Sequence, residues 1–341
     1  MQSYSTDIQA VSMQLLPWSM LSGKNILVTG ATGLIGGCLV DILMSRPGID
    51  YHIYASGRNE ERARARFSSY MSDAHFHFIR HDVTNPLESD LTFHHIILAA
   101  SNASPNFFAQ SPVEVIKANV HGVAHTIEYG LGHGMERLLY VSTGEVYGEG
   151  DGRVFTEDYS GYVNPLNPRS CYPSSKRAAE TLCACYAAEY GADVVIARPC
   201  HTFGPFFTPS DNRVYAQFIS NILRGEDIVM KSTGSQYRSW CYVVDCASAL
   251  LHILLKGECG QAYNIADPTA IITIRELAEM VAQIGHRQVV CQLAGEEERK
   301  GYNPVTRSVY SIDKLSALGW TIEGSMYEKM QRTIAAMLQF A

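Results

Sequence analysis

Residues 25–36 read Asn-Ile-Leu-Val-Thr-Gly-Ala-Thr-Gly-Leu-Ile-Gly, and this stretch decides the fold. Its first five residues form a short apolar run of the kind that suits a buried parallel strand. Gly30, Gly33 and Gly36 follow at intervals of three, and residues 33–45 then have the pattern of a helix. Glycines at this place make a tight turn, let the backbone approach a pyrophosphate and let the helix pack closely on the strand. An ordinary glycine turn is the alternative, but the strand–turn–helix context favours a dinucleotide site.

The rest of the N-terminal half repeats this alternation. Strand-like runs occur at residues 51–55, 75–80, 95–100, 137–142 and 193–198, and helix-like segments lie at 113–129 and 174–190. The first of these helices is indicated by apolar residues at helical spacing, which are Val113, Ile116, Val120, Val123 and Ile127. Alternating strands and helices predict an α/β fold with a Rossmann-type, doubly wound parallel sheet.

The pattern also divides the chain. Residues 1–22 read as an N-terminal arm or lead-in helix, and residues 23–200 as the dinucleotide-binding domain, which also carries the catalytic residues. Beyond residue 200 the pattern loosens into loops rich in proline and glycine with shorter helices. We expect residues 201–341 to form mainly a smaller, C-terminal substrate-binding lobe, with the chain crossing back to the first domain around residues 240–265.

Composition excludes several classes of protein. The chain has 341 residues, of which 46% are hydrophobic and 18% charged, so a large core is expected and disorder is not. A net charge of −7 speaks against a nucleic-acid-binding surface. No stretch of 18 apolar residues predicts a membrane helix, and the N-terminus lacks the basic start of a signal peptide. We therefore expect a cytoplasmic protein.

The cysteines and histidines do not predict a metal site. The nine cysteines contain no Cys-x-x-Cys pair, which indicates reduced thiols buried as small hydrophobic groups. His75 and His77 would share one face of a strand, but no third ligand stands at a suitable spacing.

The end of the second strand bears on which dinucleotide is bound. A site for NAD usually has Asp or Glu here, about 20 residues after the glycines, to bind the ribose 2′-hydroxyl. Residues 55–59 are Ala-Ser-Gly-Arg-Asn and contain no acid. Arg58 could meet a 2′-phosphate, which would indicate NADP, or it could be a surface residue that starts a charged helix. We expect NAD and leave NADP open. Asp82, after the third strand, contacts the adenine or caps the turn over residues 82–86.

A proton-transfer group is indicated by Tyr172 and Lys176, which share a helix face because they are four residues apart. An ammonium beside a phenol favours the phenolate, so we expect the pKa of Tyr172 to fall below its ordinary value of about 10. Tyr172 could then take a proton from a sugar hydroxyl while hydride leaves the same carbon. Thr143, at the end of the fifth strand, could share that proton. Glu145 could act as a base or position the substrate, or it could be a capping or solvated carboxylate.

Together these segments resemble the extended short-chain dehydrogenase/reductases, the NAD-dependent epimerase/dehydratase group, and within it the UDP-glucuronate decarboxylases (UDP-xylose synthases). The resemblance covers residues 24–320, nearly the whole chain. It is carried by the sequences at residues 100–105 (ASNASP), 142–148 (STGEVYG), 163–172 with Lys176-Arg177 (VNPLNPRSCY), 202–205 (TFGP), 212–214 (NRV) and 234–238 (GSQYR).

The resemblance implies an internal redox cycle on a nucleoside diphosphate sugar. Tyr172 removes the C4 hydroxyl proton, NAD⁺ takes the C4 hydride, the 4-keto uronic acid loses CO₂, and the hydride then returns. It implies catalytic roles for Thr143, Glu145, Tyr172 and Lys176. It implies a cofactor site made of Gly30, Thr32, Gly33, Leu34, Ile35, Gly36, Arg58, Asp82, Val83, Ala99, Ala100, Ser101, Asn119, Tyr172, Lys176 and Pro199. It implies a substrate site made of Asn102, Ser104, Thr143, Gly144, Glu145, His201, Arg213, Val214, Arg238 and Arg307.

Two of these residues, Arg213 and Arg238, would bind the pyrophosphate of the substrate, since a guanidinium presents a planar fork to phosphate oxygens. Surface salt bridges are the alternative role for both. The resemblance further implies a homodimer joined through the helices at 113–130 and 174–190. It also makes the synthesis of cell-envelope or capsule polysaccharide precursors an expected setting.

Several positions depart from the family's pattern. His201 replaces the usual Asn before the Phe-Gly-Pro turn, and Asn102 replaces a proline expected after Ser101. Gly144 stands where dTDP-glucose 4,6-dehydratases carry an acid, and Arg307 lies one or two positions from the place of the decarboxylases' arginine.

Two other functions remain open at this point. A nucleotide-sugar 4-epimerase or 4,6-dehydratase also begins with C4 oxidation, so the Thr143, Tyr172 and Lys176 set does not separate these enzymes. A non-catalytic dinucleotide-binding regulator is the rival from another class, because a fold alone does not determine function.

Overall fold

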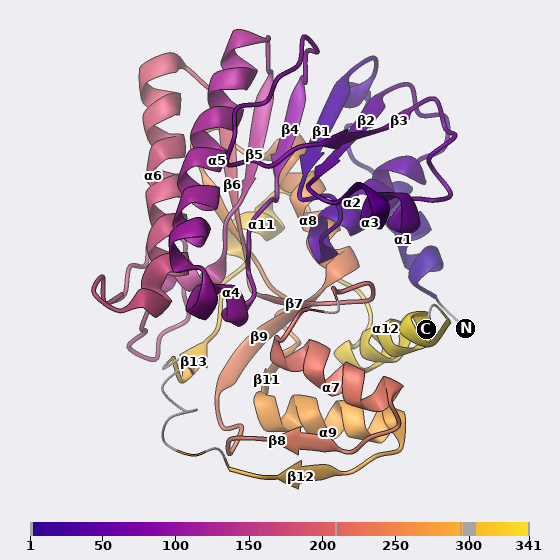
Figure 1. Cartoon of the computed structure of the whole chain (residues 1–341), viewed down its shortest axis with the longest axis vertical. Helices are drawn as coiled ribbons and strands as arrows, with labels where there is room; N and C mark the ends of the chain where they lie inside the picture. The colour runs from indigo at the N-terminus through magenta and orange to yellow at the C-terminus, as the bar shows by residue number, and fades with distance from the viewer. Residues whose placement is uncertain (1–2, 209, 294, 296–304, 340–341) are drawn as a thin grey trace.

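The computed structural model describes residues 3–208, 210–293, 295 and 305–339. Its centre is a seven-stranded, entirely parallel sheet with the strand order β10-β6-β5-β4-β1-β2-β3 (Figure 1). The strands are β1 (Asn25–Thr29), β2 (His52–Gly57), β3 (Phe76–Arg80), β4 (His95–Leu98), β5 (Arg137–Val141), β6 (Val194–Pro199) and β10 (Ala262–Ile265). This sheet confirms the predicted Rossmann-type α/β fold.

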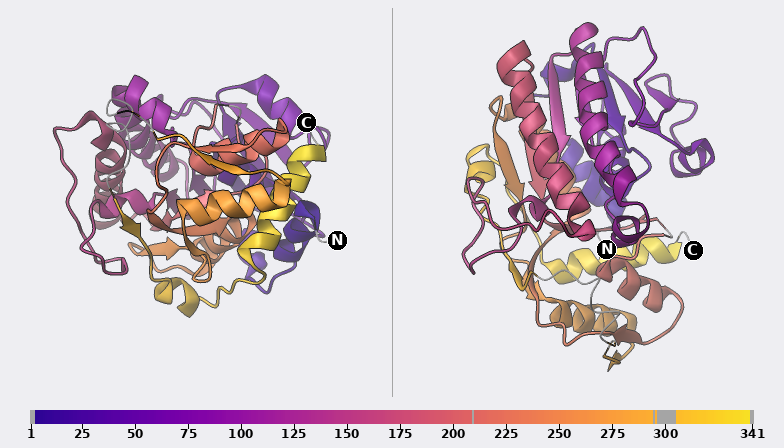
Figure 2. Two further views of the ribbon diagram at one scale, coloured as in Figure 1. Left: turned by 90° about the horizontal axis from the view of Figure 1, so that it is seen from below. Right: turned by 60° about the vertical axis from the view of Figure 1, so that its left-hand side comes forward.

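Helices cover both faces of this sheet, because its strands are buried on both sides. Leu27 of β1 points into a core shared with α5 (Pro112–Gly132) and α6 (Cys171–Tyr190). Its neighbours Ile26 and Val28 point into a second core shared with α2 (Leu34–Met44) and α8 (Val243–Lys256). Side chains of a strand alternate between its two faces, so one apolar run fills two cores. Helices α5 and α6 lie side by side on the first face (Figure 2).

The turn after β1 requires two of its glycines. Gly30 has a φ of +64°, and a Cβ there would lie 2.7 Å from the Cα of Ala100. A Cβ at Gly36 would lie 2.5 Å from the carbonyl oxygen of Gly30. Contacts this short do not occur in folded proteins, so the close packing of α2 on the turn depends on glycine. Strand β4 ends at Leu98, two residues earlier than predicted, and the amide of Ala100 donates to Oγ1 of Thr29 (3.2 Å).

Most of the remaining elements pack below the sheet in Figure 1, whereas α11 (Asp313–Ala317) lies against β10 and α4 (Pro105–Gln110) against α5. A small sheet has the order β11-β9-β13, with β7 paired to β9, and a two-stranded sheet joins β12 and β8. Their bounds are β7 (His201–Phe203), β8 (Ile228–Met230), β9 (Tyr237–Tyr242), β11 (Ile271–Thr273), β12 (Val289–Cys291) and β13 (Arg307–Ser308). The helices of this lower part are α7 (Val214–Leu223), α9 (Ile274–Gly285) and α12 (Met326–Gln339). Between β9 and β11 the chain returns to the main sheet as α8 and β10.

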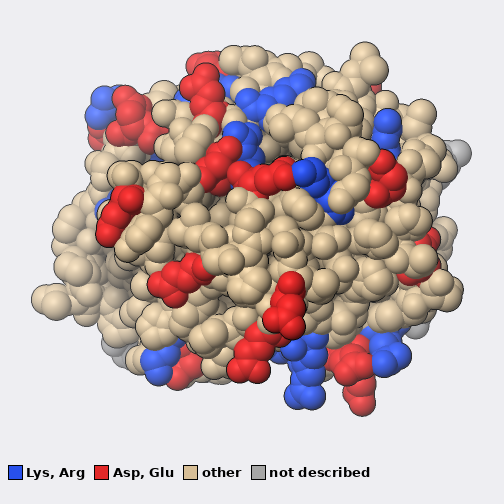
Figure 3. Space-filling view, turned by 90° about the horizontal axis from the view of Figure 1, so that it is seen from above, with Lys and Arg blue, Asp and Glu red and all other residues tan. Residues whose placement is uncertain are grey.

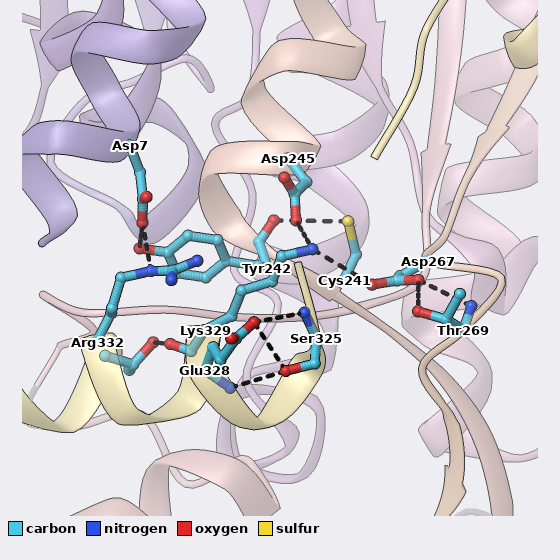
Figure 4. A network of polar contacts seen from close by, with 11 residues as sticks. Asp7, Cys241, Tyr242, Asp245, Asp267, Thr269, Ser325, Glu328, Lys329 and Arg332 are labelled. Carbon is cyan, nitrogen blue, oxygen red and sulfur yellow. Dashed lines mark hydrogen bonds and ion pairs between the residues drawn. The ribbon is translucent and has the colours of Figure 1, made fainter. Parts of the chain in front are cut away.

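A buried ionic network joins the N-terminal helix α1 (Tyr4–Ser12) to α12 and α8 (Figure 4). The carboxylate of Asp7 accepts from Nε of Arg332 (2.8 Å) and from the hydroxyl of Tyr242 (3.1 Å). The Lys329 ammonium lies between two carboxylates, 2.8 Å from Asp245 and 3.5 Å from Asp267. This network therefore connects the first and last helices through the core.

Within the described residues, no helix is both long enough and apolar enough to span a bilayer. Nor do these residues place three or more His, Cys, Asp or Glu side chains where they could hold a metal ion together. On the face seen from above, Lys and Arg side chains are interspersed with Asp and Glu, and no basic patch forms there (Figure 3).

Candidate functional site

The predicted site residues gather at the carboxyl ends of the parallel strands. The glycine turn follows β1, Ser101 and Asn102 follow β4, and Thr143 follows β5. The strand order reverses between β1 and β4, and ligands of open α/β sheets bind at such a switch point. The N-terminus of α2 also opens here: Gly33 is its N-cap, with no side chain capping the first amides. The turn and helix end can therefore receive a phosphate group.

Two arginines stand at the end of β2, where an acid is absent. Arg58 donates from Nη2 to Oδ1 of Asn102 (3.3 Å), and its Nη1 lies 3.8 Å from Oδ2 of Asp82. Arg62, in the first turn of α3 (Glu60–Arg66), donates from Nη2 to the carbonyl oxygen of Thr32 (2.8 Å). Sequence reasoning missed Arg62, although its place in the first turn of the charged helix that follows Arg58 was a usable signal.

Asp82 caps its own turn, as one of its two predicted roles required. Its Oδ1 accepts from the amide (3.0 Å) and the hydroxyl (2.9 Å) of Thr84. Asn119, on α5, is buried, and its amide oxygen and amide nitrogen both hydrogen-bond to other residues of the protein. It accepts from the Ser101 hydroxyl (2.8 Å) and donates to the Ser175 hydroxyl (2.9 Å), so it ties the loop after β4 to α6.

The other predicted ligands of the cofactor and substrate line the same edge. Val83 is buried against Gly122 of α5, and Pro199 ends β6. The Ser104 hydroxyl donates to Oδ1 of Asn212 (2.6 Å), and Val214 is the first residue of α7. These positions are compatible with the predicted roles, which stay predictions.

Tyr172 lies in the first turn of α6, which begins at Cys171, three residues before the predicted start. Its side chain is only 6% exposed, and its ring stacks on that of Phe108 at a centroid distance of 4.6 Å. The Lys176 ammonium donates to the carbonyl oxygen of Val141 (2.8 Å) and stands 6.0 Å from the centroid of the Tyr172 ring. Helical spacing thus brings the pair together as predicted.

The predicted fall in the pKa of Tyr172 is wrong for the protein alone, where the surrounding residues raise that pKa instead. Burial raises the pKa of Tyr172 to about 12, and the Glu145 carboxylate raises it as well. A hydrogen bond with Thr143 and the charges of two arginines act in the opposite direction. Burial also lowers the pKa of Lys176 to about 7, so the loss of solvation that opposes the phenolate also opposes the ammonium.

Glu145 is held by an ion pair that sequence reasoning missed. Both of its carboxylate oxygens accept from Arg169, at 3.0 and 3.1 Å, and the Arg169 guanidinium lies 4.7 Å from the centroid of the Phe108 ring. The amide of Glu145 donates to Oγ1 of Thr143 (3.2 Å). Glu145 is therefore neither a solvated carboxylate nor a helix cap. The position of Arg169, three residues before Tyr172, was the only signal in the sequence.

Arg213 and Arg238 approach the same space from the lower part of the molecule. Arg213 binds the Asp211 carboxylate through Nε (2.9 Å) and donates to the hydroxyl of Tyr215 (3.0 Å). Arg238 is almost fully buried and donates to the carbonyl oxygens of Tyr237 (3.0 Å) and Val305 (2.5 Å). Neither guanidinium is a simple surface group.

His201 begins β7 and lies beside Trp240 of β9, with 5.4 Å between ring centroids. Burial lowers the pKa of His201, and together with the charges of Arg238 and Arg213 it brings the value to about 3. Among the described residues, none hydrogen-bonds to its Nδ1. His201 is therefore a neutral imidazole with a buried Nδ1 that is unpartnered within the described residues.

Electrostatic effects show which of these groups face one another. Glu145 and Arg213 both act on the pKa of Tyr172, and Glu145 also acts on that of Arg238. Arg307 is outside this set: it is exposed on β13, with its guanidinium 6.0 Å from the centroid of the Tyr237 ring. Gly144, between Thr143 and Glu145, lies against Tyr310, because a Cβ at Gly144 would be 2.6 Å from Cζ of that tyrosine.

Comparison with known proteins agrees with this geometry. The model of the NAD dependent epimerase/dehydratase family matches residues 26–266. The chain belongs to this family. UDP-glucuronic acid decarboxylase 6 of Arabidopsis thaliana is 38% identical over 77% of this chain and 75% of its own length. UDP-glucuronic acid decarboxylase 1 of Danio rerio is 33% identical over 91% of this chain and 72% of its own length.

Solved structures of family members have the same fold. A UDP-glucose 4-epimerase of Thermus thermophilus in complex with NAD has a TM-score of 0.77 and 25% identity, over 93% of this chain and 99% of its own. A UDP-glucuronic acid 4-epimerase of Bacillus cereus, in complex with UDP-glucuronic acid and NAD, has a TM-score of 0.79 and 21% identity, over 93% of this chain and 100% of its own. This chain is thus an enzyme of a family that modifies nucleotide sugars with NAD.

Proposed function

We propose that this enzyme is a UDP-glucuronate decarboxylase that oxidises C4 of its nucleotide sugar with a bound NAD(P). The observation that carries the proposal is that Thr143 and Glu145 lie near Tyr172, with Arg213 close enough to act on the pKa of Tyr172 and Arg238 close enough to feel the charge of Glu145. Relatives 32–38% identical over most of the chain carry the name of this activity.

The residues fit a dinucleotide. The packing of Ala100 against Gly30 and of Gly36 against the turn leaves no room for a Cβ, as is typical of glycine turns whose backbone approaches a pyrophosphate. When bound, the nicotinamide supplies a hydride acceptor for C4 and later a hydride donor to the same carbon. The chain's own residues supply the proton movements and the binding.

Each residue has a defined task in this proposal. Tyr172 accepts the proton of the C4 hydroxyl, and Thr143 orients that hydroxyl. Lys176 is fixed by the Val141 carbonyl, where a cation would stabilise the phenolate that forms. Arg213 and Arg238 bind the diphosphate, and two guanidiniums concentrate an anionic substrate although the protein is acidic.

Glu145 favours chemistry at C5 over simple epimerisation at C4. Its carboxylate is fixed by Arg169 close to Tyr172, and a substrate carboxylate entering here would meet Arg169 as well as Glu145. Once C4 is a ketone, a 6-carboxylate is part of a β-keto acid, which loses CO₂ readily. The second candidate is a 4-epimerase or 4,6-dehydratase, favoured by the close fold match to 4-epimerases.

Mass spectrometry of the purified enzyme with UDP-glucuronate, without added cofactor, tests the proposal. We expect the nucleotide sugar to lose one CO₂, which would also show that the cofactor co-purifies. An unchanged substrate would contradict the decarboxylase, and UDP-, dTDP-, GDP- and CDP-hexoses would then be screened for loss of water or for an epimer of equal mass.

The end of β2 could also accept a cofactor with a 2′-phosphate, so NADP stays open beside NAD. Arg58 and Arg62 stand where an acid would otherwise bind the ribose hydroxyls. Arg62 donates to the turn after β1, and Arg58 donates to Asn102 in the loop after β4. We expect the Arg58→Ala variant to bind NADP⁺ about 10-fold more weakly, the scale of one charge-assisted hydrogen bond, and NAD⁺ almost as well as before. Calorimetric titration of cofactor-free protein measures both, with Arg64→Ala on the outer side of α3 as control. Equal losses for the two cofactors would exclude the 2′-phosphate site.

We further propose a homodimer through α5 and α6. Val113 and Ile116 of α5 and Tyr190 of α6 are exposed apolar or aromatic side chains on this helix pair. Burial of such a surface against a second copy is favourable. Light scattering at micromolar concentration should give twice the 37.7 kDa mass of one chain, and a monomeric mass would contradict the proposal.

A further inference from the structure

A second phenol, Tyr310, reaches the segment that carries the catalytic residues. It follows β13, and its ring lies so close to Gly144 that no side chain at that position would fit. Gly144 stands between Thr143 and Glu145, so Tyr310 packs against the backbone of the short segment that carries both of these residues. Tyr310 is as buried as Tyr172, with 6% of its surface exposed.

The surroundings hold Tyr310 in one position and keep it protonated. Its ring packs on Tyr147 and Phe155, at centroid distances of 5.7 and 5.6 Å, and its hydroxyl shares a hydrogen bond with the Ser308 hydroxyl. Burial raises the pKa of Tyr310, while Ser308 and the charge of Arg238 act in the opposite direction. The phenol is therefore a fixed, neutral O–H group next to an arginine of the substrate site.

The other groups of the site do not supply such a proton. Tyr172 and Thr143 serve the C4 oxygen in the proposed reaction. Glu145 is a carboxylate bound to Arg169, which makes it an acceptor. His201 is neutral, and the two arginines beside it disfavour its protonation. Loss of CO₂ from a 4-keto sugar leaves a carbanion at C5, so a proton donor separate from the C4 machinery is needed.

Resting on the function proposed above, we propose that Tyr310 is this second proton donor, a catalytic residue that protonates C5 after decarboxylation. The phenol packs on the segment after β5 at Gly144 and is close enough to Arg238 for that charge to act on it, whereas Tyr172 belongs to a separate element, α6. Two phenols on different elements then serve two neighbouring carbons of the sugar.

The step balances without a further reagent. The C5–C6 bond breaks, CO₂ leaves, and the bonding electron pair passes into the C5–C4–O enolate. That pair then takes the Tyr310 proton to form the new C5–H bond, and C4 becomes a ketone again. The phenolate regains a proton from water, for which the Ser308 hydroxyl is a relay. Hydride return to C4, with a proton from Tyr172, completes the turnover.

Turnover of UDP-glucuronate in heavy water tests the role of Tyr310. The Tyr310→Phe variant removes the hydroxyl and keeps the ring that fills the site. Its kcat should be at least about 10²-fold lower than that of the wild type, which is the scale for losing a positioned acid. It should still oxidise C4, so reduced nicotinamide should accumulate in its absorbance spectrum. NMR of the product should show deuterium on one face of C5 for the wild type, and on both faces for any residual product of the variant.

The control is Tyr159→Phe, which removes a nearby phenol whose hydroxyl donates only weakly to the Glu149 carbonyl (3.4 Å), and it should behave as the wild type does. Deuterium on a single face in Tyr310→Phe, or unchanged turnover, would overturn the role of Tyr310 while leaving the proposed function intact. If the wild type itself releases no CO₂ from UDP-glucuronate, the proposed function fails and the role of Tyr310 at C5 fails with it. Loss of turnover without accumulation of reduced nicotinamide would place Tyr310 before C4 oxidation and would also overturn the inference.

Discussion

Replacing Tyr172 by phenylalanine is expected to lower kcat about 10²–10⁴-fold, because the variant loses the group that accepts the C4 proton. The phenol is buried against Phe108, and phenylalanine keeps that stacking, so the fold and the binding of the cofactor should change little. The loss should fall on the first chemical step. Mixing the variant with substrate should therefore produce no reduced nicotinamide, whereas the wild type should show it transiently.

Glu145→Gln is the contrasting variant for this measurement. Its neutral amide cannot form the ion pair that holds Arg169 where the substrate carboxylate would enter, but the groups that act on the C4 hydroxyl remain, so C4 oxidation should continue while the later loss of CO₂ stops. Cofactor affinity, measured by titration, should match the wild type in both variants. If Tyr172→Phe retains most of its turnover, the proposed proton transfer is wrong.

Replacing Lys329 by methionine is expected to cause the largest loss of stability. Its ammonium is 2% exposed and lies between Asp245 and Asp267, as Figure 4 shows, so the substitution leaves two buried carboxylates facing each other. Breaking a buried ion pair by removing one partner costs about 3–5 kcal/mol. Urea unfolding at pH 7 measures the change. Lys314→Met is the control, because the Lys314 side chain is partly exposed and its ammonium contacts the neutral Gln261 side chain (2.9 Å) and the Tyr263 ring (5.0 Å to the centroid).

The same variant should have a distinctive pH dependence. Burial raises the pKa of Asp245 to about 6, and Lys329 opposes that rise. A carboxyl group whose pKa is higher in the folded state destabilises the fold as pH increases through that value, and the penalty disappears at low pH. Without Lys329 the pKa rises further, so the difference from the wild type should shrink between pH 7 and pH 5. A difference that is constant over this range would show that the lost lysine chain, not its charge, stabilises the core.

Some features of the site were predictable because they depend on neighbours in the chain. The alternation of strands and helices, the glycine turn after residue 29 and the shared face of Tyr172 and Lys176 are all local patterns. Their geometry follows from helix and strand periodicity, so the structure reproduces them with shifts of a few residues at the ends. The strand ends then placed Thr143 and Glu145 at the edge of the sheet where ligands bind.

Other features were not predictable because they join residues distant in sequence. The pairing of Glu145 with Arg169, the contact of Arg62 with the carbonyl of Thr32 and the approach of Tyr310 to Gly144 arise only when separate elements pack together. Sequence similarity drew attention to Arg307, whereas the alternation of strand β13 turns that side chain outward and the neighbouring Ser308 inward.

The sequence by itself determined the fold class, the position of the glycine turn after β1 and the pairing of Tyr172 with Lys176 on one helix face, since short-range spacing controls all three. Only the tertiary structure decided the protonation of the site. Burial raises the pKa of Tyr172 and lowers that of Lys176 and His201. The cost of removing a charge from water depends on every group that surrounds it, and those groups come from all parts of the chain.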